Sequence, residues 1–155
     1  MGIWRRVEDT WHSRKESKLK QSTKRYTKTA IILHWSIALL LVLVIGLAYL
    51  LDAFPDESQQ FATVIGLHKS IGITILALSL ARLAWRFLNK PPQLPASTPA
   101  WQRWAAHAVM FLIYALTIAT PLVGWAMSSA DGHATSFFGM FNLPNLLGEN
   151  ENIAE

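Results

Sequence analysis

The sequence predicts an all-α integral membrane protein, an antiparallel bundle of transmembrane helices in which three spans can be recognised. The first observation is composition: 52% of the 155 residues are hydrophobic and only 15% are charged, whereas soluble domains carry about 25% charged residues. The second is that three stretches are apolar over the length needed to cross a bilayer. The third is that Lys and Arg gather at alternate ends of these stretches. Together they disfavour a soluble all-α core and exclude a disordered chain.

The first span is expected at residues 29–51 and the third at residues 101–129. The first contains no Asp, Glu, Lys or Arg over about 22 residues, enough to cross a hydrocarbon core of about 30 Å at 1.5 Å per residue. The third is free of charge after Arg103. Pro121 lies inside it and should kink the helix.

The second span is expected at residues 61–87. It is interrupted by His68-Lys69 near its start and by Arg82 and Arg86 near its end. Long cationic side chains at such positions reach the membrane interface with their charged ends. Beyond the third span, residues 130–155 show no helical period and are expected to form an outer segment.

The distribution of charge predicts the topology. Nine of the 14 Lys and Arg residues lie in residues 1–28, whereas residues 52–60 and the segment after Ala130 carry only acidic charges. The positive-inside rule therefore places the N-terminus and the second connection in the cytoplasm. We expect a basic cytoplasmic tail at residues 1–28 and a transmembrane domain at residues 29–155. Topology and anionic lipid headgroups explain the excess of Lys and Arg over Asp and Glu, so no nucleic-acid partner is expected.

Histidines at membrane depth are the candidate metal ligands. The chain has no Cys, which excludes iron–sulfur clusters, zinc sites of the cysteine type and covalently attached haem. His34 lies roughly 9 Å from the cytoplasmic start of its span, and His68 roughly 12 Å from the outer face. Ionisable groups at this depth are rare and usually functional. Imidazole is a good axial ligand of haem iron in a helical bundle, so both are predicted to bind haem rather than merely to pack.

The depths of the two histidines indicate two separate haems. His34 and His68 should differ in height by roughly 10 Å or more, whereas two axial nitrogens on one iron lie about 4 Å apart, because each iron–nitrogen bond is about 2 Å. Each haem therefore needs a further ligand from elsewhere. His107 lies near the cytoplasmic start of the third span, at the height of His34, and is a candidate to approach that site.

Two other residues are candidates for cofactor binding, each with an open alternative. Gly72 lies one turn after His68 on the same face and would let a porphyrin lie close to the helix, but small residues also serve plain helix packing in membranes. Arg82 shares that face and could pair with a haem propionate. Its alternative role is that of an interfacial cation that helps to set topology.

Several motifs together resemble the bacterial cytochrome b561 family, which is related to the b-type cytochrome subunits of hydrogenases. The resemblance covers roughly residues 24–155 and leaves residues 1–23 as an extension. The motifs are Tyr26-Thr27 with Ile32-Leu33-His34-Trp35, His68-Lys69-Ser70-Ile71-Gly72 with Ala81-Arg82-Leu83-Ala84-Trp85-Arg86, and Ala106-His107 with Tyr114 and Pro121-Leu122-Val123-Gly124-Trp125.

The resemblance implies a four-helix membrane cytochrome with two haems b that exchanges electrons with quinone. His34 and His68 match the first- and second-helix ligands, and the fourth helix would supply both opposing histidines. His107 matches a third-helix histidine expected near a propionate or a quinone. Only three spans are present, and residues 149–155 resemble the approach to a fourth helix. We therefore expect the chain to be truncated at its C-terminal end.

The expected function is electron transfer by haem b in the bacterial inner membrane, between the quinone pool and a redox partner protein or a small oxidant. An oxidoreductase activity on superoxide is one form of this function, and service as the membrane subunit of a hydrogenase or dehydrogenase is another. The alternative from a different class is a cofactor-free membrane adaptor or assembly protein. Membrane lipid is an expected partner, and homodimer formation stays open.

Overall fold

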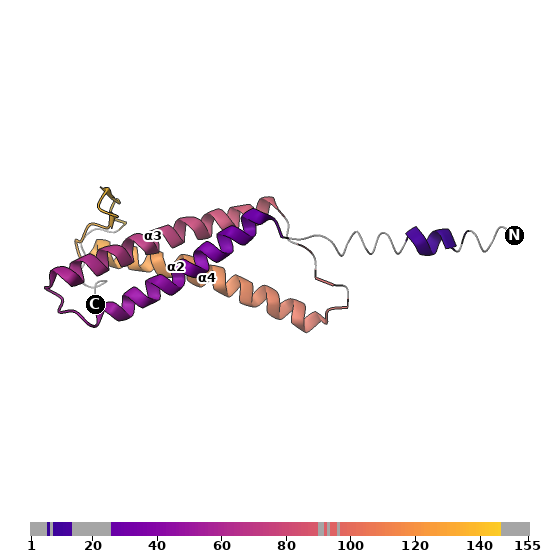
Figure 1. Ribbon diagram of the computed structural model, residues 1–155, viewed down its shortest axis with the longest axis horizontal. Helices are drawn as coiled ribbons and strands as arrows, with labels where there is room; N and C mark the ends of the chain where they lie inside the picture. The colour runs from indigo at the N-terminus through magenta and orange to yellow at the C-terminus, as the bar shows by residue number, and fades with distance from the viewer. Residues whose placement is uncertain are drawn as a thin grey trace.

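The computed structural model describes residues 6, 8–13, 26–89, 92, 94, 95 and 97–146. Three long helices follow one another, α2 (Lys28–Leu51), α3 (Gln59–Leu88) and α4 (Ala100–Ala130), and a short antiparallel hairpin of β1 (Ser136–Phe137) and β2 (Phe141–Asn142) comes after them (Figure 1). All three helices are long and apolar enough to cross a membrane. The predicted all-α membrane fold is therefore confirmed, and each helix begins and ends within two residues of its expected span.

Most of the basic tail and the acidic run at residues 149–155 lie outside the described residues. The two ends of the bundle nevertheless differ in charge. One end carries Lys28, Arg86 and Arg103, and we refer to it as the basic end. The opposite end carries Asp52 and Asp131, and we refer to it as the acidic end.

Hydroxyl side chains cap the first two helices at the positions where local sequence favours a start. Thr27 accepts a hydrogen bond from the Ala30 amide at 3.3 Å, and Ser58 accepts one from the Phe61 amide at 3.1 Å. Each cap pairs one of the amides that a helix leaves without an internal partner. Helix α4 begins after Pro99 and continues through Pro121 to Ala130.

Helix α3 is the central element of the bundle. It contacts both α2 and α4, whereas α2 and α4 share no contact within the described part of the chain. Ile37 of α2 packs with Ile71 and Ile75 of α3 in the buried core. Figure 1 shows α4 crossing beside the other two helices and diverging from them toward its start at Ala100. The divergence opens a space between α2 and α4 whose floor is α3.

Most large apolar side chains of α2 and α4 point away from the bundle. Leu39, Val42, Phe111 and Leu116 are more than half exposed, which in water would be unfavourable over so large a surface. Within a bilayer these side chains meet lipid tails. The exposed apolar surface is therefore the physical reason for the membrane location.

The hairpin after α4 was not expected from the sequence. It is attached to the helices by serine side chains that are almost fully buried. Ser70 of α3 accepts a hydrogen bond from the Phe138 amide at 2.9 Å, and Ser129 of α4 accepts one from the Leu146 amide at 3.2 Å. The Ser128 hydroxyl donates to the His133 carbonyl at 3.1 Å. The segment after α4 is thus held against the acidic half of the bundle.

Candidate functional site

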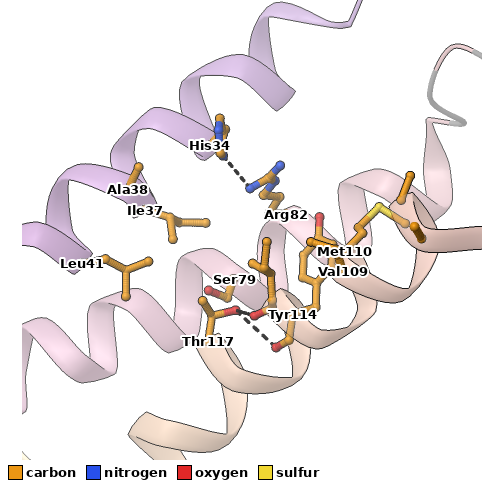
Figure 2. A pocket seen from close by; sticks show the side chains of 13 residues that line it. His34, Ile37, Ala38, Leu41, Ser79, Arg82, Val109, Met110, Tyr114 and Thr117 are labelled. Carbon is orange, nitrogen blue, oxygen red and sulfur yellow. Dashed lines mark hydrogen bonds between the residues drawn. The ribbon is translucent and has the colours of Figure 1, made fainter. Parts of the chain in front are cut away.

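A cavity of about 450 Å³ lies between α2 and α4 in the basic half of the bundle. His34, Ser79, Arg82 and Tyr114 provide its main polar groups (Figure 2). The rest of the lining is mostly apolar and includes Ile37, Ala38 and Leu41 from α2 and Val109, Met110 and Ile113 from α4. A mostly apolar cavity with a few convergent polar groups is the usual form of a cofactor site.

His34 lies at the rim of this cavity and is held by Arg82. The Arg82 Nη1 atom lies 2.9 Å from the His34 Nδ1 atom, and Figure 2 shows the two side chains meeting across the space between α2 and α3. A guanidinium group only donates hydrogen bonds, so Nδ1 is the acceptor in this pair. The bond fixes the direction in which the imidazole faces.

Arg82 also contacts Tyr114 of α4. Its guanidinium carbon lies 5.6 Å from the centre of the Tyr114 ring, within the range of a cation–π interaction. No Asp or Glu in the described part of the chain forms an ion pair with Arg82. One half-buried cation therefore joins all three helices, and its charge is not neutralised by a carboxylate.

A second cavity of about 390 Å³ adjoins the first on the side of the basic end. The two share His34, Arg82, Met110 and Tyr114. Aromatic side chains and a second arginine distinguish the second cavity, which is also lined by Tyr26, Trp35, Trp85 and Arg86. The Trp85 indole donates to the Thr27 hydroxyl at 2.9 Å and joins the start of α2 to the end of α3.

His68 lies in the acidic half of α3 and does not line either of these cavities. The side chain is half-buried and close to the backbone of Val44 in α2. Its Nδ1 atom is buried and has no hydrogen-bond partner among the residues that the structure describes. A buried ring nitrogen without a partner is costly unless another group uses it. The chemistry of this position therefore fits a ligand-binding imidazole.

The register of the helices separates His34 from His68. Arg82, which contacts His34, lies fourteen residues beyond His68 on α3, or about 21 Å along the helix. Val44, which neighbours His68, lies ten residues beyond His34 on α2, or about 15 Å. Both measures exceed the roughly 4 Å between two axial nitrogens of one iron. The two histidines therefore cannot ligate the same metal ion.

His107 is exposed, and its Nδ1 atom donates to the Arg103 carbonyl at 2.6 Å within α4. It does not line either cavity, although Tyr114 two turns later lines both. The divergence of α4 is not the reason, because Ala105 and Ala106, nearer to Ala100, do line the first cavity. The His107 ring is instead held against its own helix by the bond to the Arg103 carbonyl. The structure thus brings His34 and Arg82 together and leaves His107 apart from them.

Gly72 faces helix α4. A side-chain carbon at this position would lie 4.0 Å from the Cβ atom of Pro121, an ordinary van der Waals contact. Gly72 therefore lies where α3 packs against α4, but the packing does not require a glycine. No residue on either helix in the described ranges needs to move to admit an alanine at Gly72.

Among the described residues no group of three His, Cys, Asp or Glu side chains gathers as a bare metal site would require. A haem needs only one or two protein ligands, because the porphyrin supplies the other four nitrogens. Isolated histidines at two heights, one beside an arginine and an apolar cavity, therefore fit haem better than a bare ion.

Sequence reasoning missed two parts of the site. Ser79 is 1% exposed, its hydroxyl has no partner, and it lines the first cavity. The sequence feature that could have indicated Ser79 is its position three residues before Arg82, on the same face of α3. The hydrogen bond between Trp85 and Thr27 is the second part, because both residues were singled out from the sequence only as members of the family motifs.

Comparison with known proteins shows which family the chain is similar to. The family model described as prokaryotic cytochrome b561 matches residues 25–155. The chain is 30% identical over 129 residues to cytochrome b561 homolog 1 of Escherichia coli K12, covering 83% of this chain and 73% of the relative. It is 31% identical over 127 residues to cytochrome b561 homolog 2 of the same bacterium, covering 81% and 67%. It is 29% identical over 133 residues to the probable superoxide oxidase CybB of Yersinia pestis, covering 85% and 73%.

Proposed function

The chain belongs to the prokaryotic cytochrome b561 family, and on that premise we propose that it transfers electrons through two haems b held at different heights by His34 and His68. It is a multi-pass protein of a bacterial membrane and a b-type cytochrome, and its family implies haem b. Family membership favours this function over a cofactor-free adaptor. Haem b supplies one-electron chemistry at its iron.

The separation of His34 and His68 is the observation that carries the proposal. The register places them about 15–21 Å apart along the bundle, one in each half. Two redox groups at these heights form a path for electrons across the bilayer. A single group could not reach from one half to the other.

At the His34 site, His34 would hold the haem iron through one of its ring nitrogens. The other ring nitrogen would then carry the proton, so neither nitrogen could accept the hydrogen bond that Arg82 now donates to Nδ1. The Arg82 guanidinium would be free to pair with an anionic group such as a propionate.

At the His68 site, the unpartnered Nδ1 atom and the half-buried ring support a role as ligand. The surrounding apolar core, with Ile71 and Ile75 on the same helix, excludes water from this part of the bundle. His107, outside both cavities, is proposed to act on a propionate or on quinone rather than on iron. Gly72 is also proposed not to bind iron; its proposed role is that of a packing position beside the porphyrin.

Quinone is the proposed electron partner in the membrane. The second cavity, with Tyr26, Trp35 and Trp85 in its lining, offers flat aromatic surfaces for a quinone ring. Arg82 and Arg86 supply hydrogen-bond donors for its carbonyl oxygens. Because this cavity adjoins the His34 cavity, a quinone here would lie next to one redox group.

The charges at the acidic end do not favour superoxide as substrate. An anion is steered by exposed positive charge, but the Lys69 ammonium is half-buried and donates to the Ser128 hydroxyl at 2.8 Å. The described loops at this end expose Asp52, Asp56 and Asp131 instead. By the positive-inside rule we further propose that the basic end faces the cytoplasm.

A spectroscopic experiment tests the proposal. Reduced-minus-oxidised absorption spectra and haem content are measured for the purified protein and for His34→Ala, His68→Ala and the control His133→Ala, an exposed histidine outside the spans. We expect His34→Ala and His68→Ala to remove different haems, distinguished by redox titration, and the control to remove none. Loss of the same haem in both variants, or a protein without haem bands, would refute the proposal.

A further inference from the structure

The hairpin at residues 136–142 exposes a cluster of large apolar side chains. Phe138 is 47% exposed, Met140 69% and Phe141 58%. Figure 1 shows the hairpin standing off the side of α3, short of the connection between α2 and α3 rather than beyond the end of the helices. The cluster therefore belongs to an element that lies beside the helices and not beyond their ends.

The segment that contains the hairpin is devoid of charge. Residues 132–148 include no Asp, Glu, Lys or Arg, although acidic residues stand on either side at Asp131 and Glu149. A loop of this length in water normally carries charged residues. The absence of charge over this run indicates that it is not bathed in water alone.

The attachment point places the hairpin at membrane depth. Ser70, which binds β1, lies sixteen residues from Arg86, or about 24 Å along α3. With Arg86 at one face of a hydrocarbon core of about 30 Å, Ser70 lies about 6 Å inside the opposite face, so His68 lies closer to that face than the roughly 12 Å expected from the sequence. It also lies eleven residues, or about 16 Å, from the start of the helix at Gln59. The hairpin thus sits where hydrocarbon meets headgroups.

Backbone groups of the hairpin find partners within the protein. Non-helical backbone at membrane depth must find its hydrogen bonds in this way. The Phe138 amide donates to the Ser70 hydroxyl, which lies 3.2 Å from the Ser136 carbonyl. The Met140 amide donates to the Phe137 carbonyl at 3.0 Å. These backbone groups are therefore paired, while the apolar side chains of Phe138, Met140 and Phe141 stay exposed.

From these observations we propose that the hairpin is an interfacial anchor whose Phe138, Met140 and Phe141 side chains insert into the adjoining lipid leaflet. The occupant of this surface is bilayer lipid, continuous with the lipid that covers α2 and α4. Phe is among the apolar side chains that interfacial segments bury at the boundary between headgroups and acyl chains. Because Ser70 is two residues from His68 on α3, the anchor fixes the depth of the helix that carries the proposed ligand.

The natural absence of Cys allows a direct test with single labels. Met140→Cys and, as a second position, Phe141→Cys are labelled with an environment-sensitive fluorophore in the full chain, reconstituted in phosphatidylcholine vesicles. Asp56→Cys in the exposed connection between α2 and α3 is the matched control at the same end. Emission is then quenched either by lipid that carries a spin label near its headgroup or by iodide in the water. Helix content measured by circular dichroism shows that each labelled variant is folded.

We expect the labels at positions 140 and 141 to lose most of their emission to the spin-labelled lipid and little to iodide, with the reverse pattern at position 56. Quenching by iodide alone at positions 140 and 141 would show that the hairpin projects into water and would overturn the proposal. Protection from both quenchers would show that protein covers it, from a second copy or another part of the chain, and would equally overturn it. Neither result depends on haem, so the proposed electron transfer is tested separately.

Discussion

Replacing Ser70 with alanine isolates the bond that holds the hairpin to α3. Ser70 is 2% exposed, and its hydroxyl accepts from the Phe138 amide at 2.9 Å while lying 2.8 Å from the Gly66 carbonyl. The substitution removes one oxygen atom and leaves the Phe138 amide without this acceptor. The methyl group of alanine occupies no new space, so packing changes little.

The expected cost follows from the unpaired amide. A buried donor left without a partner costs about 1–3 kcal/mol. The higher helix propensity of alanine stabilises α3 whether or not the hairpin is attached, so it does not enter this equilibrium. The loss corresponds to about a 5- to 160-fold rise in the population of the detached hairpin.

Ser79 provides a control in the same helix. It is 1% exposed, and its hydroxyl is buried without a partner. Ser79→Ala gains the same helix propensity as Ser70→Ala but removes an unsatisfied group rather than a satisfied one. We therefore expect that Ser79→Ala leaves the stability unchanged or raises it slightly.

Amide hydrogen exchange followed by mass spectrometry measures the effect directly. Peptides that contain residues 136–142 should exchange faster in Ser70→Ala than in the natural sequence, and at the natural rate in Ser79→Ala. Equal exchange in the two variants would refute the reasoning, because it would mean that the Ser70 hydroxyl does not hold the hairpin. Peptides from α2 should exchange alike in all three proteins, which shows that any change is local.

Three other variants test the basic half. His107→Ala should leave haem content unchanged while slowing quinone-linked electron transfer, and loss of a haem in the spectrum would instead identify His107 as a ligand. Arg82→Gln should lower the midpoint potential of the His34-linked haem, because removing a nearby positive charge favours ferric iron, and Arg82→Lys should largely restore it in a redox titration. Trp85→Phe removes the donor to Thr27 and should cost about 0.5–1.5 kcal/mol of stability in denaturant unfolding; an unchanged midpoint would show that this bond is not stabilising.

The spans were predictable because each depends only on local composition. A run of apolar residues as long as the bilayer is thick forms a helix whatever its neighbours are, and the bounds of α2, α3 and α4 follow from it. Contacts between helices depend also on rotation and register, which composition does not determine. His34 and Arg82 were each singled out from the sequence, but their bond, between residues 48 positions apart, was not.

The hairpin and the placement of His107 show what else the sequence left open. The Ser70 hydroxyl accepts a hydrogen bond from the amide of Phe138, 68 residues later in the chain, and nothing in the sequence near Phe138 indicates this partner. Helical spacing puts His107 and Tyr114 on similar sides of α4, yet only Tyr114 lines the cavities. The side-chain conformation of His107, bonded to the Arg103 carbonyl of its own helix, separates their environments, and a sequence pattern does not determine a side-chain conformation.

The arrangement in which α3 alone joins α2 and α4 has a consequence for biosynthesis. As it enters the bilayer, α3 finds its packing partner in α2, inserted just before it, and α4 finds its own in α3. Among the described elements no span has to wait for a distant part of the chain, and the hairpin returns to α3 only after α4 is in place. Contacts between consecutive elements are those that form fastest, so the polypeptide can assemble in the order in which it is made.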